Sequence, residues 1–277
     1  MNPIQALRKI HRLAFTHRAY KFMVREFMRP DDLDALAETL ACTRHLRTLE
    51  PLLMEVPRGQ RVMVIAPHED DEMIGPGGTI LKLSRTGTKV RVLYLADDTS
   101  DRGEARRRET MKISNVVGYE TEFLGYSAND IPVNSASTER VARAIDGFLP
   151  DVLMVPFLSD DHHDHRVASQ LLSEAYKSGG LRARPEVWAY QVYSAILPNV
   201  IVDITEVAAD KSNAICMWQE SAMLTRDWAH YALGLNAYNC RLLTGNNGRS
   251  YVEAFFVLPF ADYMSICATY LDKRSVS

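Results

Sequence analysis

The chain contains 277 residues, of which 47% are hydrophobic and 24% are charged, and its formal net charge is −3. This length allows one substantial hydrophobic core, and the near-neutral charge argues against a nucleic-acid-binding protein, which would carry a basic surplus. The four cysteines are far apart and form no C-x-x-C pair, so the sequence predicts neither a zinc ribbon nor a disulfide framework and favours the reducing cytoplasm. Because no run of about 18 apolar residues is present and basic residues interrupt the N-terminus, we expect neither a transmembrane helix nor a cleavable signal peptide.

The first 56 residues differ in pattern from the rest of the chain. Residues 1–29 carry seven lysines and arginines against one acid, Glu26, with apolar residues interleaved at helical spacing. A second helical pattern follows Pro30 and runs to about Leu53. We therefore predict an N-terminal helical extension at residues 1–56 and a main domain at residues 57–277.

Two roles for this extension are open. It can pack on the main domain as a helical hairpin, or residues 1–29 can form a basic amphipathic surface that contacts a polyanionic partner or, peripherally, anionic lipid at the inner membrane surface. Sedimentation with anionic vesicles distinguishes the two roles. Membrane contact requires that the intact chain sediments with the vesicles at low salt and that a chain lacking residues 1–56 stays in the supernatant.

From residue 61 onward, apolar runs typical of buried strands alternate with helical patterns. The predicted strands are 62–66, 89–96, 122–124, 151–157, 186–193, 200–204 and 251–258. The predicted helices are 79–85, 104–117, 138–148, 167–176, 205–223 and 228–243. Strands that alternate with helices of this length predict βαβ units and an α/β fold with a mostly parallel sheet.

The predicted strand at 62–66 is followed directly by the polar segment P-H-E-D-D-E and then by a glycine-rich turn. In open α/β sheets ligands bind at the carboxyl ends of the strands, and charges there are costly to bury unless they are paired or bound to a cation. His68 and Asp71, three residues apart in a tight loop, can offer one nitrogen and one oxygen to a common zinc ion, and Asp70 beside them can act as a base toward a bound water. The alternative is a helix N-terminus that carries acids because the helix dipole favours them.

A second polar segment, S-D-D-H-H-D-H-R at 159–166, follows the predicted strand at 151–157. If the two strands are parallel, this segment lies at the same sheet edge as the first. We predict that His165 is the third metal ligand and that His162 is a proton donor or hydrogen-bonds an oxyanion. Asp164 can orient a histidine ring, as carboxylates behind metal ligands do. The alternative is a polar loop whose histidines are incidental.

Together, A-P-H-E-D-D-E-M-I-G-P-G-G at 66–78 and H-H-D-H-R at 162–166 resemble the two signature motifs of the PIG-L/LmbE family of zinc-dependent N-deacetylases. Weaker similarities are G-E-A-R-R-R-E at 103–109, F-L-G-Y at 123–126, L-P-N-V-I-V-D-I-T at 197–205 followed by Lys211, and V-E-A-F-F at 252–256. The resemblance covers about residues 60–258 and implies a Rossmann-like α/β sheet. It also implies hydrolysis of the acetamide of an N-acetyl amino sugar such as N-acetylglucosamine, as a small molecule or linked to lipid or polymer.

The resemblance also implies roles for the residues of the first motif and for the last histidine of the second. By motif position, His68, Asp71 and His165 match the metal ligands. The implied metal is Zn²⁺, although Fe²⁺ can use the same ligands. Asp70 matches the general base.

Further roles follow from the same resemblance. His162 matches the histidine that helps to stabilise the tetrahedral intermediate, and Asp164 matches the carboxylate that orients this histidine. Arg106 is a candidate for substrate binding through sugar hydroxyls or a phosphate. The chain departs from the family pattern at Glu69 and His163, which stand where proline is frequent.

Two other functions are compatible with the sequence. Asp161-His162-His163 spells the D-H-H tripeptide of a phosphoesterase family, whose chemistry usually needs two metals about 3.5–4 Å apart. A non-enzymatic scaffold that binds membrane or a partner would explain residues 1–29 but not the two polar segments.

Overall fold

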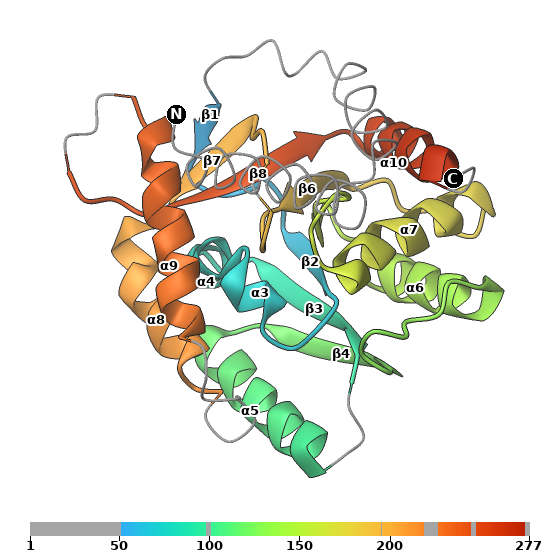
Figure 1. The fold of residues 1–277 in the computed structure, drawn as a ribbon, viewed down its shortest axis with the longest axis horizontal. Coiled ribbons are helices and arrows are strands. Elements are labelled where there is room, and N and C mark those ends of the chain that lie inside the picture. Colours follow the sequence, from blue (N-terminus) through green and yellow to red (C-terminus); the bar gives the residue numbers. More distant parts are fainter. Residues whose placement is uncertain (1–50, 98–100, 195, 219–226, 245–247, 275–277) are drawn as a thin grey trace, which may run out of the picture. The chain divides into compact units, whose positions relative to one another are not determined.

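The computed structural model describes residues 51–97, 101–194, 196–218, 227–244 and 248–274 (Figure 1). The chain divides into one unit of residues 45–267 and a second unit of residues 1–44 and 268–277. Apart from residues 51–56, the predicted N-terminal extension lies outside the described residues, and so does the predicted membrane contact of residues 1–29.

An eight-stranded sheet forms the centre of the larger unit, with the strand order β1-β7-β8-β6-β5-β2-β3-β4. Neighbouring strands run parallel, except that β8 is antiparallel to both β6 and β7. The strands are β1 (Leu52–Met54), β2 (Arg61–Ala66), β3 (Lys89–Ala96), β4 (Glu120–Tyr126), β5 (Val152–Pro156), β6 (Glu186–Tyr190), β7 (Val200–Asp203) and β8 (Val252–Leu258). The α/β fold with a mostly parallel sheet is therefore confirmed.

Helices cover both faces of this sheet. Figure 1 shows α6 and α7 together on one side, and α4, α8 and α9 on the other. The described helices are α3 (Asp71–Ile74), α4 (Gly77–Arg85), α5 (Asp101–Val117), α6 (Ser135–Phe148), α7 (His163–Lys177), α8 (Ala208–Ile215), α9 (Trp228–Asn239) and α10 (Phe260–Arg274), with 3-10 turns at Thr205–Val207 and Cys240–Leu242. No described helix combines the length and the apolarity that a bilayer crossing requires.

The central strands β2 and β5 are neighbours, and the chain leaves them in opposite directions. After β2 the chain passes through α4 to β3 on one side, and after β5 it passes through α7 to β6 on the other. Val62 pairs with Val152 and Val64 with Met154, so the two strands end at the same edge of the sheet. This is the topological switch point, where open α/β sheets bind their ligands.

Helix α7 begins earlier than its apolar pattern predicted. The predicted start was residue 167, whereas the helix starts at His163. His162 caps the helix, because its ring nitrogen Nδ1 accepts the backbone N–H of Asp164 at 3.2 Å. The last four residues of the second polar segment, 163–166, therefore form the first turn of a helix instead of a loop. The helix fixes the spacing of their side chains.

The other departures lie at element ends and at the sheet edge. Strand β1 forms at Leu52–Met54, where the pattern predicted helix to about Leu53, and it pairs with β7. Helix α8 ends at Ile215 instead of continuing, and α9 ends at Asn239. Helix α10 was not predicted. Element boundaries are set partly by tertiary contacts, which a local pattern does not contain.

A buried ion pair supports the turn between α3 and α4. The Lys211 ammonium is fully buried and donates to Glu253 Oε1 at 2.7 Å and to the carbonyl oxygens of Ile74 and Gly75 at 2.9 and 3.0 Å. Glu253 in turn accepts the backbone N–H of Gly78 at 2.7 Å. Burial lowers the pKa of Lys211, and the Glu253 carboxylate opposes this shift. The pair thus fixes the backbone that follows the first polar segment.

We expect Lys211→Met to lower the free energy of unfolding by about 3–5 kcal/mol, because it leaves the Glu253 carboxylate buried without its cation. The measurement is urea denaturation. Arg85→Met is the matched control. Arg85 also joins α4 to α8, through Asp210 at 2.6 Å, but both side chains are about half exposed, and such a pair contributes only about 0–1 kcal/mol. Equal effects of the two substitutions would contradict the role of the buried pair.

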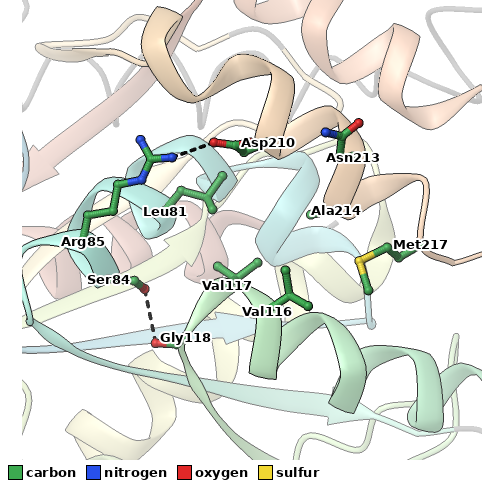
Figure 2. A pocket seen from close by; sticks show the side chains of 10 residues that line it. All are labelled: Leu81, Ser84, Arg85, Val116, Val117, Gly118, Asp210, Asn213, Ala214 and Met217. Carbon is green, nitrogen blue, oxygen red and sulfur yellow. Dashed lines mark hydrogen bonds and ion pairs between the residues drawn. The ribbon is translucent and has the colours of Figure 1, made fainter.

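The Arg85–Asp210 pair borders a pocket of about 500 Å³ between α4, α5 and α8 (Figure 2). Its lining includes Val117 and Gly118, which precede β4, and Arg85 itself ends the helix that precedes β3. The pocket therefore lies toward the amino ends of the strands. It is at the opposite edge of the sheet from the two polar segments.

Candidate metal centre and active site

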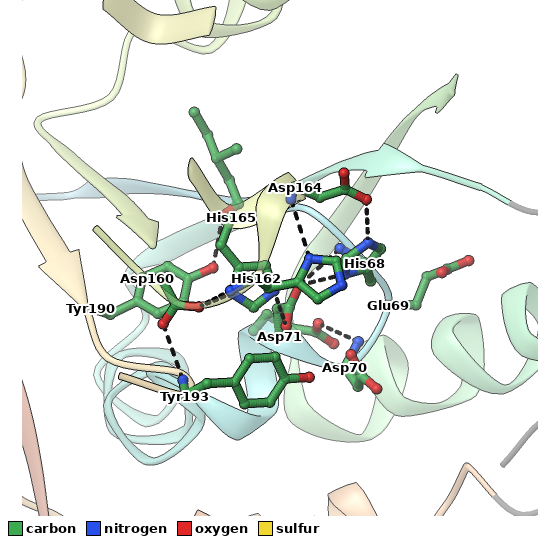
Figure 3. Close-up of polar contacts among 12 residues, drawn as sticks. His68, Glu69, Asp70, Asp71, Asp160, His162, Asp164, His165, Tyr190 and Tyr193 are labelled. Atoms are coloured by element: carbon green, nitrogen blue, oxygen red, sulfur yellow. Dashed lines mark hydrogen bonds and ion pairs between the residues drawn. The ribbon is translucent and has the colours of Figure 1, made fainter. Parts of the chain in front are cut away.

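The two polar segments meet at the switch point (Figure 3). His68 follows β2 after one intervening residue, and His162 and His165 stand at the start of the helix that follows β5. The ring centroid of His68 lies 4.9 Å from that of His162 and 5.7 Å from that of His165. The rings of His162 and His165 are 4.9 Å apart. Segments almost a hundred residues apart in the chain thus build one cluster.

The Asp71 carboxylate lies between two of these histidines. Its Oδ2 accepts the backbone N–H of His68 at 2.9 Å and lies 3.3 Å from Nδ1 of the His68 ring. Its Oδ1 lies 3.2 Å from Nε2 of His165. The side chains of Asp71 and His165 are both fully buried. The three predicted ligands are therefore together.

Two atoms of this group indicate a metal site. Asp71 Oδ1 and His165 Nε2 are buried and make no hydrogen bond with the described residues, although they lie 3.2 Å apart. Buried polar atoms are rarely left in this state, and a divalent cation would satisfy both. His68, His162 and His165 also offer one ligand atom each within 4.8 Å of one another. The residues present thus fit a metal held by histidines, with Asp71 as an additional or alternative ligand.

Asp164 does not orient the histidine to which the family pattern assigned it. Its carboxylate oxygen Oδ2 lies 2.8 Å from Nε2 of His68, and it accepts the backbone N–H of Asn129 at 2.7 Å. Its contact with His162 is made by its own backbone N–H. The reason is the helix start. His162 is the cap residue, so its ring folds back onto the helix backbone, while the Asp164 side chain reaches His68 in the loop after β2.

Asp160 is a functional candidate that sequence reasoning missed. Its Oδ1 lies 2.8 Å from Nδ1 of His165, and its Oδ2 accepts the backbone N–H groups of Tyr193 and Ser194. Burial would raise the pKa of the Asp160 carboxyl, but these hydrogen bonds and the nearby His165 lower it. Asp161 beside it is exposed. Nothing in the spacing S-D-D-H distinguishes the two aspartates, although a carboxylate behind a ligand histidine is common in metal sites.

The carboxylates around the histidines favour positive charge in the cluster. Burial alone would lower the pKa of His68, but hydrogen bonds to Asp164 and Asp71 raise it to about 10. The pKa of His165 is likewise lowered by burial and raised by Asp71 and Asp160, to about 9. The carboxylates that favour a proton on these rings also favour a divalent cation between them.

Asp70 has an unusual backbone conformation. Its backbone φ of 148° lies in a region that residues other than glycine rarely adopt. The surrounding contacts hold it there, since its N–H donates to Glu72 Oε2 at 3.1 Å and its carbonyl oxygen accepts the N–H groups of Met73 and Ile74. Glu72 is itself fixed by the Tyr119 hydroxyl at 2.9 Å, and burial raises the pKa of Glu72 to about 8. Such strain is typical of functional sites.

Arg106 from α5 pairs with the proposed base. Its Nη2 donates to Asp70 Oδ2 at 2.7 Å and also to the carbonyl oxygen of Glu69. Burial raises the pKa of the Asp70 carboxyl, and the Arg106 guanidinium opposes this shift. The Glu69 side chain is buried as well, with its Oε2 3.4 Å from Arg106 Nε. Arg106 thus belongs to the site as a partner of Asp70, and its predicted contact with substrate stays a prediction.

The glycines after the acidic segment allow close packing. A Cβ on Gly75 would lie 2.4 Å from the Tyr190 ring, and one on Gly78 would lie 2.7 Å from Ile204. Neither contact is made by the far end of a long, flexible side chain that could move aside. The glycines therefore let the loop approach β6 and the end of β7 without a clash.

Comparisons with known proteins match the part of the chain that carries both polar segments. Residues 63–176 match the family model described as PIG-L: GlcNAc-PI de-N-acetylase. The diacetylchitobiose deacetylase of Thermococcus kodakarensis is 28% identical over 182 residues, which are 56% of this chain and 68% of that protein.

Solved structures share the fold. The N,N'-diacetylchitobiose deacetylase of Pyrococcus horikoshii superposes with a TM-score of 0.61 at 21% identity, covering 89% of this chain and 94% of that one. The 4-carboxy-2-hydroxymuconate hydratase GalB of Pseudomonas putida KT2440 superposes with a TM-score of 0.60 at 22% identity, covering 72% and 96%. Because a hydratase and a deacetylase share this architecture, the fold alone does not select the reaction.

Proposed function

Because the chain belongs to the PIG-L/LmbE family, we propose that it is a metal-dependent N-deacetylase that removes the acetyl group from an N-acetylated amino sugar or its conjugate. The observation that carries the proposal is the pair of buried atoms, Asp71 Oδ1 and His165 Nε2, that face one another beside Asp70 without a hydrogen bond. This donor pair, formed by the two family motifs together, supports a reaction at a bound metal.

His68, Asp71 and His165 would hold the metal, and we propose that it is zinc, whose usual ligands are imidazole nitrogens and carboxylate oxygens. Iron(II) accepts the same ligands. When bound, such a metal lowers the pKa of a coordinated water to about 7 and polarises the carbonyl of the substrate. Asp164 and Asp160 hydrogen-bond the rings of His68 and His165 from behind and keep their other nitrogens directed at the site.

Asp70 is the proposed general base. Its carboxylate is partly exposed at the site, and Arg106 Nη2 holds its Oδ2 at 2.7 Å, which leaves the other oxygen to accept a proton from the attacking water. Burial raises the pKa of the Asp70 carboxyl, and the ion pair with Arg106 opposes this rise.

His162 is the proposed hydrogen-bond donor to the oxyanion. Its Nδ1 accepts the Asp164 N–H, so a neutral ring carries its proton on Nε2 and can donate it there. Burial, together with the neighbouring His165 and His68, lowers the pKa of His162, which favours this neutral form. Loss of one such donor typically lowers kcat by about 10²–10³-fold.

The phosphoesterase alternative is not favoured. Of the D-H-H tripeptide, Asp161 and His163 are exposed, and His162 alone faces the site. Phosphoesterase chemistry with two metals would require further carboxylate and histidine ligands near the strand ends.

Acetate release tests the proposed reaction. The full chain, purified with zinc, is incubated with N-acetylglucosamine, its β-linked disaccharide and a lipid glycoside, and in parallel with bis(p-nitrophenyl) phosphate. We expect acetate and free amine from at least one N-acetyl sugar and no hydrolysis of the phosphodiester. Phosphodiester hydrolysis without acetate release would refute the proposal.

A further inference from the structure

A row of aromatic rings extends from the proposed metal site to the surface. The Tyr193 ring stacks on His165, with centroids 5.2 Å apart and an interplanar angle of 17°. Trp228 follows at 5.8 Å from Tyr193, and Tyr231 at 6.0 Å from Trp228. His165 at the inner end is fully buried, Tyr193 is 40% exposed, Trp228 is partly buried, and Tyr231 at the outer end is 55% exposed. The row therefore connects the reacting centre with solvent.

Two independent devices hold these rings in place. The Asp160 carboxylate that contacts His165 through Oδ1 also accepts the Tyr193 backbone N–H through Oδ2 at 3.1 Å, so one side chain positions both (Figure 3). Asp227 caps α9 by accepting the backbone N–H of His230 at 2.9 Å. This cap makes Trp228 the first residue of α9, and Tyr231, three positions later, lies on the same face of the helix.

A sugar ring suits such a row. The two faces of a pyranose ring carry C–H groups, while its hydroxyls project around the rim. Aromatic side chains bury a large apolar area against such a face and leave the rim free to hydrogen-bond with water or protein. Tyr and Trp rings also lose little conformational freedom when they bind, because few torsions are fixed.

We propose that Tyr193, Trp228 and Tyr231 form a subsite for a second sugar ring, joined to the N-acetylated ring whose acetamide is cleaved. The substrate class is then an N-acetyl amino sugar within a disaccharide or longer glycan, in preference to the free monosaccharide. This inference rests on the proposed deacetylase function, and it assigns to the aromatic row a role in specificity and not in the chemical step.

The test compares the holoenzyme on N-acetylglucosamine and on N,N'-diacetylchitobiose. Trp228→Ala should lower the ratio of the two kcat/KM values, disaccharide over monosaccharide, by about tenfold, the factor that corresponds to 1.4 kcal/mol. Tyr231→Ala should lower it less, since this ring is more exposed. Tyr238→Ala is the matched control, because Tyr238 is 59% exposed on the same helix but packs against Arg241 at 4.5 Å.

Fluorescence gives a second readout that does not depend on turnover. Diacetylchitobiose added to the Asp70→Asn variant should change the emission of Trp228, and the further substitution Trp228→Phe should remove that change. Unchanged ratios in both alanine variants, with acetate still released, would overturn the subsite and leave the deacetylase function intact. p-Nitrophenyl N-acetylglucosaminide serves as a third substrate, in which a flat aromatic group replaces the second sugar. If the alanine variants lose kcat/KM on this substrate alone, the row binds a flat aromatic group and the sugar subsite is overturned. Acetate release from no N-acetyl sugar would overturn both proposals.

Discussion

Replacing Asp70 with asparagine should lower kcat by about 10²–10⁴-fold, the usual contribution of general acid–base catalysis, while the metal stays bound. Asparagine keeps the size of the side chain and can still contact Arg106, but it cannot take a proton from the attacking water. The base is distinct from the three proposed ligands, so metal content should not change. Steady-state acetate release and metal analysis on the same preparation give both values.

Asp161→Asn is the control for this substitution. Asp161 belongs to the second polar segment, but its side chain is exposed and lies outside the cluster. Its replacement should leave kcat within about twofold, as expected for a surface change that alters no packed contact. An Asp70→Asn variant that keeps most of its activity would remove Asp70 as the base.

Replacing His165 with alanine should remove the metal and, with it, the activity. This ring is the most buried of the three histidines, and its Nε2 makes no hydrogen bond with the described residues. Because loss of a residue behind a ligand already weakens metal binding by about 10–100-fold, loss of a ligand should weaken it at least as much. Elemental analysis after dialysis against a low concentration of zinc gives the occupancy.

His163→Ala is the matched control for this prediction. His163 stands two positions before His165 in the same helical turn, but its side chain is exposed. The His163→Ala variant should bind as much zinc as the unmodified chain does. Full zinc occupancy in His165→Ala would disprove the ligand assignment.

The sequence predicted the features that depend on strong local patterns. The apolar runs that became β2 and β5 are buried on both faces, and this burial explains why they are continuous and not alternating. The polar segments after them were predicted to meet because parallel strands end at one edge. That the strands are direct neighbours at a switch point follows from the sheet order, which the local pattern does not contain.

Other features of the fold and the site depend on tertiary contacts, which a local sequence pattern does not contain. Which ring the Asp164 carboxylate contacts was settled by where α7 begins, since His162 at the cap directs its own ring to the helix backbone. Tyr193 reaches the site through a backbone hydrogen bond to Asp160, a residue 33 positions earlier. Strand β1 has only three residues, two of them exposed, and so shows no alternation to detect.

Acetate release should require a metal held by the two polar segments together. The direct measurement is activity against bound metal, in enzyme stripped by a chelator and then titrated with zinc. We predict that acetate release disappears on stripping, returns in proportion to bound zinc and reaches its maximum at one zinc per chain, and that Asp71→Asn shifts this titration to higher zinc. Full acetate release from the stripped chain, with no metal bound, would show that the reaction does not depend on this metal site.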